Sequence, residues 1–226
     1  MNKKETIQIA IDGPGGSGKS TLAKLVAARL GFIYVDTGAI YRAIALYCLR
    51  NHIAVDNAQA VTAVLDAVQV DISYADQIQQ VLLNGENVSA DIRTMAVAQA
   101  TSIVSAIPAV RDKLLALQQN MAATNNVVMD GRDIGTVVLP QADLKIFLTA
   151  SVETRAKRRQ AELAAKGEVV DLALLTQEIQ ARDDRDSTRA IAPLVQASDA
   201  VLIDTTHDTI DQVLDKIITL AKPYVA

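Results

Sequence analysis

A glycine-rich loop near the start of the chain has the residue types needed to bind a chain of phosphates. Residues Gly13 to Ser20 match the pattern GxxxxGK[ST], follow an apolar strand-like segment and open a helix-like one, as this motif requires. Glycines let backbone amides face an anion, Lys19 can reach the β- and γ-phosphates, and Ser20 can ligate Mg²⁺. A nucleoside triphosphate is therefore expected to contact Gly13, Pro14, Gly15, Gly16, Ser17, Gly18, Lys19, Ser20 and Thr21.

Motors, switches and kinases all carry such a loop, so other residues must decide between them. Asp130 ends the apolar segment 127–129. Ligands of open α/β sheets bind at the carboxyl ends of the strands, so this carboxylate could hold Mg²⁺ together with Ser20. The alternative is a turn-forming Asp before Gly131. The segment 130–136 alternates charge and glycine more densely than a plain connection needs, which favours a site.

The helix expected from about Asp171 to Ala190 has a face that changes character along its length. Leu172, Leu175 and Ile179 share one stripe at 100° per residue, and charged residues continue it. Charged groups on a core-facing stripe are tolerated when they are paired or meet a ligand, so this end should border an anion site. A mutual Arg–Asp network, or a helix that leaves the core, are the alternatives. The charged residues on or near the stripe are Arg182, Arg185, Asp186 and Arg189.

A basic cluster at 155–159 is expected on the helix after the fourth strand. Its arginines Arg155, Arg158 and Arg159 fall within about one third of the helical circumference. In a P-loop kinase, a mobile lid at this place could lower guanidinium groups over the transferring phosphoryl group. A charge run of this kind is equally compatible with a solvated helix face.

The chain has more candidate guanidinium groups than one triphosphate in a backbone cradle requires. Arg42 is the only charged residue between Thr37 and Leu49, and Arg132 lies in the segment after Asp130. A second phosphate-bearing ligand is the economical explanation. A phosphate acceptor needs its charge neutralised, whereas a hydroxyl acceptor needs a base. The arginine surplus favours the phosphate acceptor, while Asp133 keeps a hydroxyl acceptor open as its possible base.

The elements that must position these residues alternate along the chain. Short apolar, strand-like segments lie at 7–11, 32–35, 126–129, 144–148 and 200–203. Helix-like segments lie at about 19–30, 39–50, 94–107 and 110–123. This alternation is typical of βαβ units, and we predict an α/β fold with a five-stranded parallel sheet flanked by helices.

An insertion is expected between the second and third strands, because roughly ninety residues are too many for one crossover helix. Segment 68–74 alternates apolar and polar residues, and segment 80–88 has Asn84-Gly85 between strand-like arms. An Asn-Gly pair in this setting is a strong hairpin signal. The sequence therefore predicts a small antiparallel sheet within the insertion.

Composition excludes several classes of protein. Half of the 226 residues are hydrophobic and 21% are charged, which fits a single folded domain. The net charge of −4 would repel a nucleic acid, so any phosphate site must be local. Met1 to Glu5 does not begin a signal-peptide core, and no apolar run is long enough to span a membrane. With Cys48 as the single cysteine, we expect a cytoplasmic protein.

Four segments together closely resemble the bacterial cytidylate kinase family: Gly13–Ser20, Asp36–Arg42, Asp130–Val138 and Arg182–Asp186. The resemblance runs almost end to end. It implies a monomeric cytoplasmic P-loop kinase that requires Mg²⁺ and transfers the γ-phosphoryl group of ATP to CMP or dCMP. The implied regions are a core at about 1–38, 124–152 and 190–226, a monophosphate-binding region with the insertion at about 39–123, and a helical lid at about 153–189.

The resemblance also implies roles for individual residues. Arg42, Arg132 and Arg189 would hold the acceptor phosphate, with Thr37 standing where the family often has Ser. Ser102, Arg111 and Asp133 would contact the cytosine edge, and Ser102 and Arg111 rest on the resemblance alone. Arg182 and Asp186 would contact the sugar. The residues expected to act in catalysis are Lys19, Arg132, Arg158, Arg159 and Arg185.

A carboxylate at Asp133 would favour cytosine, because cytosine offers an amino donor where uracil offers a carbonyl. Two other functions stay open at this point. One is a P-loop kinase for a small hydroxylated metabolite with Asp133 as general base. The other is a regulatory module that binds ATP without turnover, against which the inward-facing arginines argue.

Overall fold

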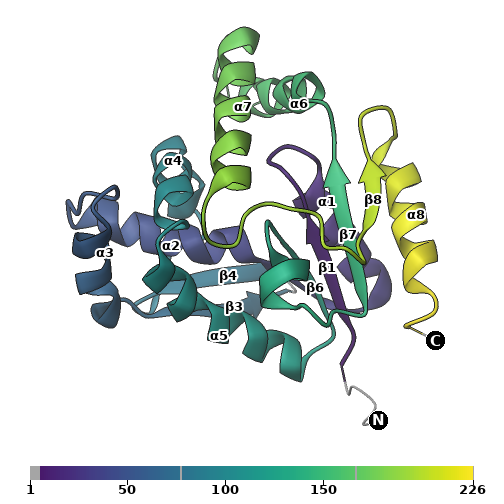
Figure 1. The fold of residues 1–226 in the computed structure, drawn as a ribbon, viewed down its shortest axis with the longest axis horizontal. Helices are drawn as coiled ribbons and strands as arrows, with labels where there is room; N and C mark the ends of the chain where they lie inside the picture. Colours follow the sequence, from purple (N-terminus) through teal and green to yellow (C-terminus); the bar gives the residue numbers. More distant parts are fainter. Residues whose placement is uncertain (1–5, 77, 166, 226) are drawn as a thin grey trace.

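A parallel sheet of five strands forms the centre of the molecule, which confirms the predicted fold class (Figure 1). The computed structural model describes residues 6–76, 78–165 and 167–225, so Met1 to Glu5, where no signal core is expected, lie outside it. The strand order is β2-β6-β1-β7-β8. The strands are β1 (Gln8–Asp12), β2 (Ile33–Asp36), β6 (Val127–Gly131), β7 (Leu144–Thr149) and β8 (Val201–Asp204).

The register of these strands brings carboxylates to one edge of the sheet. Asp130 on β6 is opposite both Asp36 on β2 and Ile11 on β1, and Asp12 is opposite Gly131. The central strand β6 is buried along its whole length, as expected for a parallel strand covered on both faces. The carboxyl ends of β1, β2 and β6 therefore meet at the edge where the phosphate loop begins.

Helices cover both faces of this sheet. Apolar side chains of α1 (Lys19–Leu30) and α8 (Ile210–Ala221) pack on one face in a single buried cluster. On the other face, α5 (Pro108–Thr124) and a short π-helix, η3 (Ile134–Val138), contribute to a second cluster. The predicted helix 94–107 ends earlier, at Val104, and the next helix starts with Pro108, a residue favoured in the first turn.

The insertion contains the predicted antiparallel sheet. Asn84 (φ 49°) and Gly85 (φ 84°) both have positive φ, as a tight two-residue hairpin turn requires. The side-chain amide of Gln79 accepts a hydrogen bond from the backbone N–H of Asp36 and donates one to its C=O. These two hydrogen bonds connect this sheet to β2. The short helix α3 has no counterpart in the prediction. The elements of this region are α2 (Thr37–Arg50), α3 (Ala58–Val64), η1 (Leu65–Ala67), β3 (Val70–Ala75), β4 (Ile78–Leu83), β5 (Glu86–Asn87), η2 (Asp91–Arg93) and α4 (Met95–Val104).

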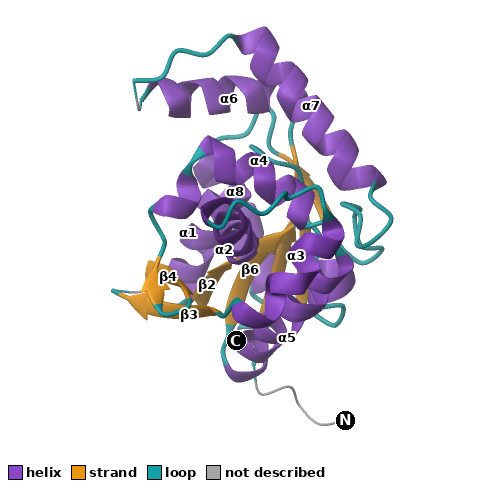
Figure 2. Cartoon of the chain, turned by 90° about the vertical axis from the view of Figure 1, so that its left-hand side faces the viewer, coloured by secondary structure: helices purple, strands orange, loops and turns teal. Residues whose placement is uncertain are grey.

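Two helices, α6 (Val152–Ala164) and α7 (Leu172–Thr188), stand above the carboxyl ends of the strands in both views (Figures 1 and 2). They share a small apolar cluster of their own, which includes Leu163 and Leu175. The side chain of Asp171 accepts the backbone N–H of Leu174 and so caps the start of α7. The predicted helix at 171–190 is confirmed within two residues at each end.

Candidate active site

The phosphate loop connects β1 to α1 through a backbone that only glycines adopt readily. Gly13, Gly16 and Gly18 have φ of 144°, 77° and 91°. A Cβ on Gly13 would lie 1.9 Å from the carbonyl oxygen of Leu148, so a side chain has no room there. Lys19 is buried and its Nζ donates to the carbonyl of Pro14 at 2.7 Å. Burial and the nearby Arg132 guanidinium lower the pKa of this amine.

Asp130, which the sequence analysis predicts to bind a metal, lies beside the start of α1. Its Oδ2 accepts the hydroxyl of Ser20 at 2.8 Å, and its Oδ1 accepts the hydroxyl of Tyr34 at 2.8 Å. Burial, together with the charge of Asp36, raises the pKa of Asp130. A hydroxyl and a carboxylate side by side are the oxygen donors that Mg²⁺ takes when phosphates and water complete its shell. Among the described residues, no cluster of three or more His, Cys, Asp or Glu suggests another metal site.

The charged end of α7 turns inward, as the stripe predicts. Asp186 is buried and accepts Nε of Arg132 at 2.9 Å, while Arg182 on the same helix lies 3.9 Å away. Burial alone would raise the pKa of Asp186, but the Arg132 and Arg182 guanidinium groups outweigh the effect of burial and hold this pKa below its usual value. The Arg–Asp network considered as an alternative is thus present, and it lies beside the phosphate loop: a Cβ on Gly15 would be 3.5 Å from Arg132 Nη2.

A second buried ion-pair cluster surrounds Asp133. Arg111 of α5 donates to its Oδ2, and Arg189 lies 3.5 Å from its Oδ1. The Arg111 guanidinium also lies over the ring of Tyr41, 5.5 Å from its centre. Burial raises the pKa of Asp133 against the opposing effect of Arg111 and Arg189. Sequence patterns alone single out Asp133 but not Arg111, and the structure shows the two side chains in direct contact.

Ser102 and Arg185 approach each other at the rim of this region. Nε of Arg185 lies 3.5 Å from Oγ of Ser102, which brings α7 against α4. Arg185 is exposed and Ser102 is half-buried. Arg185 is therefore more open to solvent than the other residues predicted for the acceptor side.

Arg42 faces the carboxyl end of β2. Its Nη1 lies 3.9 Å from Oδ2 of Asp36, which also accepts Nη2 of Arg93 at 3.1 Å. Burial lowers the pKa of Arg42, and the nearby Arg93 and Arg132 charges lower it further. Thr37 follows Asp36 and donates its hydroxyl to the carbonyl of Asp130 at 2.8 Å. Arg93, which lies in η2 of the insertion, was missed by the sequence analysis because the residues around it show no motif.

The three arginines of α6 differ in placement. Arg155 is buried and donates to the carbonyl of Gly15 at 3.1 Å and to Asp183 of α7 at 2.5 Å. Arg158 donates to the carbonyl of Thr205 at 2.6 Å and approaches that of Gly16 at 3.4 Å. Within the part of the chain that the structure describes, Arg159 forms an ion pair with Glu162 of its own helix and with no other residue, and it is half-exposed. The structure therefore brings Arg155 and Arg158 to the phosphate loop but not Arg159.

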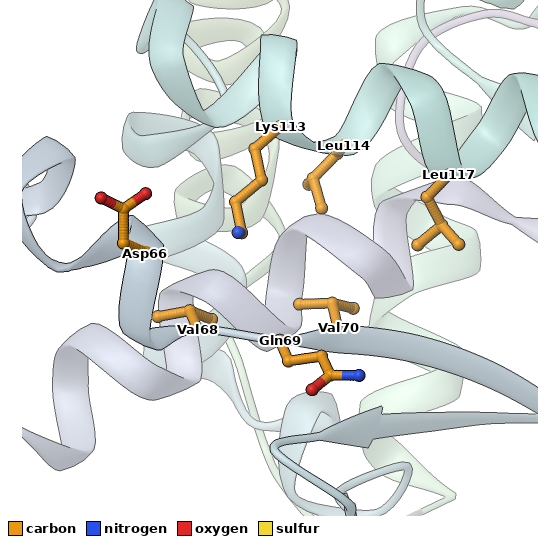
Figure 3. Close-up of a pocket in the computed structure, with 7 residues that line it drawn as sticks. All are labelled: Asp66, Val68, Gln69, Val70, Lys113, Leu114 and Leu117. Carbon is orange, nitrogen blue, oxygen red and sulfur yellow. The ribbon is translucent and has the colours of Figure 1, made fainter.

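A separate cavity of about 210 Å³ lies between β3 and α5, away from these residues (Figure 3). Val68 and Val70 line one side of it, and Lys113, Leu114 and Leu117 of α5 line the opposite side. It contains none of the predicted site residues, which lie around the phosphate loop and the charged end of α7.

A phosphate loop beside paired arginines at the carboxyl edge of a five-stranded parallel sheet defines a P-loop kinase. A family model described as cytidylate kinase matches residues 9–223. Two relatives named cytidylate kinase, from Geobacillus sp. (strain WCH70) and Caldicellulosiruptor saccharolyticus, are 48% and 51% identical to this chain. The alignments cover 96% and 95% of this chain and 97% and 95% of the relatives. The chain therefore belongs to the cytidylate kinase family.

The fold is also similar to solved structures. A crystal structure of an uncharacterized protein from Eubacterium ventriosum covers 97% of this chain and 99% of its own, with a TM-score of 0.52 and 13% identity. At this identity the likeness concerns the fold alone. None of the described helices has the length and apolar character needed to cross a lipid bilayer.

Proposed function

We propose that this protein transfers the γ-phosphoryl group of ATP to CMP or dCMP, with ADP and CDP or dCDP as products. The observation that carries the proposal is the pair of buried ion clusters around Asp133 and Asp186, next to the phosphate loop of a cytidylate kinase family member. Arginines held in this way can exchange a carboxylate partner for a phosphate at little electrostatic cost.

Catalysis would depend on positioning and charge neutralisation, because the acceptor phosphate arrives already ionised. Lys19 and Arg132, both close to the loop, would stabilise charge on the transferring group. Arg158 already lies 3.4 Å from the Gly16 carbonyl, and the exposed Arg185 and the α6 residue Arg159 would join these residues when α6 and α7 approach the loop. We propose segment 153–189 as this lid, about 39–123 as the monophosphate-binding region, and the remaining segments, about 1–38, 124–152 and 190–226, as the core.

Ser20 and Asp130 would hold Mg²⁺, since their oxygens already meet at 2.8 Å. When bound, the ion supplies positive charge that stabilises the β- and γ-phosphate oxygens. We also propose a monomeric enzyme that works in the cytoplasm, in keeping with its single buried Cys48.

The acceptor would bind across the two ion clusters. Thr37, Arg42, Arg132 and Arg189 would take the phosphate, and Arg182 and Asp186 the sugar. Ser102, Arg111 and Asp133 would contact the base. A hydroxyl acceptor with Asp133 as base is not favoured, because both carboxylate oxygens of Asp133 already face arginines. A carboxylate oxygen at this position is suited to accept a hydrogen bond from the amino group of cytosine.

An acceptor panel in a coupled ADP assay tests this function. Wild-type protein should turn over with CMP and dCMP and only slowly with UMP. Asp133→Asn should reduce the CMP-to-UMP preference about 10- to 100-fold, because one bidentate or charge-assisted base contact is worth about 1–3 kcal/mol. Turnover confined to a sugar or another alcohol would show that the proposed function is wrong.

A matched control is Asp184→Asn on α7. Asp184 is exposed and its carboxylate accepts the amide of Gln180 at 2.8 Å, so the variant makes the same chemical change away from the ion clusters. It should keep the wild-type preference for CMP. If both variants lose the preference equally, Asp133 does not contact the base.

A further inference from the structure

Asp12 is a buried carboxylate that none of the predicted site sets includes. It is the last residue of β1, directly before Gly13 of the phosphate loop, and 5% of its surface is exposed. Its Oδ1 accepts the backbone N–H of Ile134 at 2.8 Å, and its Oδ2 accepts that of Gly135 at 2.7 Å. One side chain at the start of the phosphate loop thus holds two consecutive amides more than 120 residues later in the chain.

These two amides begin η3, the short π-helix that follows β6. The first amides of a helix have no partner within it and need an acceptor from elsewhere. The side chain of Asp133, the residue before η3, makes no cap hydrogen bond, because its carboxylate faces Arg111 and Arg189. Asp12 supplies the missing acceptor from the neighbouring strand and leaves Asp133 available for the site.

The segment that Asp12 holds carries two residues of the proposed acceptor site. Arg132 and Asp133 lie between Gly131, which ends β6, and the amides fixed by Asp12. This connection has little room to shift: a Cβ on Gly131 would lie 2.6 Å from Ile134 and 2.8 Å from Oγ1 of Thr37. The position of the Arg132 and Asp133 side chains therefore depends on where η3 begins.

We propose that Asp12 is a positioning residue for the acceptor side: by fixing the amides of Ile134 and Gly135, its carboxylate sets where Arg132 and Asp133 lie relative to the phosphate loop. This inference rests on the proposed function, since it concerns how that acceptor is read. It also links the two halves of the site, because the residue that leads into the donor loop fixes the segment that meets the acceptor.

The ionisation of Asp12 supports this role. Burial raises its pKa to about 6, against the opposing effect of the two amide hydrogen bonds. Among the charged groups around it, Asp133 raises this pKa and Lys19 lowers it. The aliphatic part of Lys145 packs on the same side of Gly135 as Asp12, since a Cβ on Gly135 would lie 3.1 Å from Lys145 Cδ and 3.4 Å from Asp12 Oδ2. Below that pH one oxygen becomes a hydroxyl, which is a weaker acceptor for an amide N–H than an ionised carboxylate oxygen and has a proton of its own to donate. The hold on η3 should then weaken.

Asp12→Asn tests the role at neutral pH. Asn keeps the shape but replaces one acceptor oxygen with an amino group, so one buried amide loses its partner. We expect the KM for CMP to rise roughly tenfold, the effect of about one lost buried hydrogen bond, with the KM for ATP nearly unchanged. The CMP-to-UMP preference should fall as well, because Asp133 shifts.

The control is Asp143→Asn. The Asp143 carboxylate also accepts a β1 amide, that of Gln8 at 2.8 Å, but at the opposite end of the strand. This variant should keep wild-type KM values and base preference. The proposal is overturned if Asp12→Asn behaves like Asp143→Asn, or if its KM for ATP rises as much as that for CMP. Failure of the proposed function would instead appear in the wild-type protein, as absence of turnover with CMP and dCMP.

A titration of the wild-type protein keeps the proposal testable if Asp12→Asn fails to fold. Amide proton shifts of Ile134 and Gly135, followed by NMR without nucleotide, should move together with a midpoint near pH 6. The ratio of kcat/KM for CMP over UMP should fall over the same range, and the ratio cancels the ionisation of the nucleotide phosphate. Flat amide shifts, or a ratio that stays constant while the amides titrate, would show that Asp12 does not position the acceptor side.

Discussion

The donor and acceptor sides of this site are built in opposite ways. The donor side is one continuous loop whose backbone forms the cradle, with positive φ at Gly13, Gly16 and Gly18. The acceptor side is made of side chains from α2, α5, α7 and the segment after β6, which meet as Arg–Asp pairs. One side depends on backbone shape, and the other on charge balance.

This difference determines how each side responds to change. A backbone cradle built from glycines with positive φ tolerates almost no added volume. Buried ion pairs tolerate small changes in shape that a backbone cradle would not. Removing one partner, however, leaves the charge of the other uncompensated. We therefore expect donor-side substitutions to act through sterics at any pH, and acceptor-side substitutions to act through charge and to depend on pH.

The largest effect is expected from Gly13→Ala. The added methyl group would lie 1.9 Å from the Leu148 carbonyl oxygen, in a φ of 144° that side chains rarely adopt. The loop must shift, so ATP affinity and turnover should fall at least about 1000-fold, since positioning dominates phosphoryl transfer. Nucleotide binding by calorimetry and turnover in the ADP assay measure this loss.

Gly31→Ala is the matched control for Gly13→Ala. Gly31 also has positive φ, 70°, at the end of α1, but nothing lies within 4 Å of the position of its Cβ. It should cost about 1 kcal/mol of stability and leave ATP affinity unchanged. If both variants lose ATP binding equally, the loss comes from placing alanine at a positive φ and not from the contact of the added methyl group with Leu148.

The sequence predicts the donor side almost completely, because its determinants are local. A glycine pattern of eight residues fixes the loop and its contacts with the following helix. The parallel sheet follows from the spacing of apolar segments, and the Asn84-Gly85 hairpin from the φ that such a pair allows. The inward charged end of α7 follows from helical periodicity.

The acceptor side is only partly predictable, because its contacts join residues far apart in the chain. Arg42 and Asp133 could be singled out from pattern alone. Arg93, which shares the Asp36 carboxylate with Arg42, and Arg111, the partner of Asp133, could not. Asp12 looks like an ordinary strand-end residue until its contact with η3 is known. Arg159 shows that helical spacing alone can also mislead. The spacing places Arg159 beside Arg155 on α6, but its side chain pairs with Glu162 of the same helix and does not reach the phosphate loop.

Asp186→Asn tests the charge dependence of the acceptor side. The Arg132 and Arg182 guanidinium groups would lose their shared carboxylate, which should lower the free energy of unfolding by about 1–3 kcal/mol at neutral pH, discounted because both arginines are partly exposed. The pKa of Asp186 is lowered in the folded protein. Its stabilising effect is therefore present above the unfolded value of about 4 and is lost below it.

The melting temperatures of wild type and Asp186→Asn should accordingly differ most near pH 7 and converge as the pH falls below about 4. Asp184→Asn, an exposed neighbour on the same helix, should follow the wild type throughout. A difference that is constant with pH would indicate that Asp186 stabilises by shape or by neutral hydrogen bonding, and the contrast with the donor side would then be wrong.

The smallest effect is expected from Arg159→Ala on α6. Its ion pair with Glu162 at 3.2 Å is largely exposed, and such pairs contribute about 0–1 kcal/mol. The melting temperature should therefore stay close to that of the wild type. If the lid brings Arg159 over the phosphates, kcat should fall roughly tenfold with the KM for CMP unchanged, because the contact exists only in the closed state. Lys157→Ala, which removes the exposed pair with Glu153, is the control, and identical kcat in the two variants would leave the lid role to Arg158.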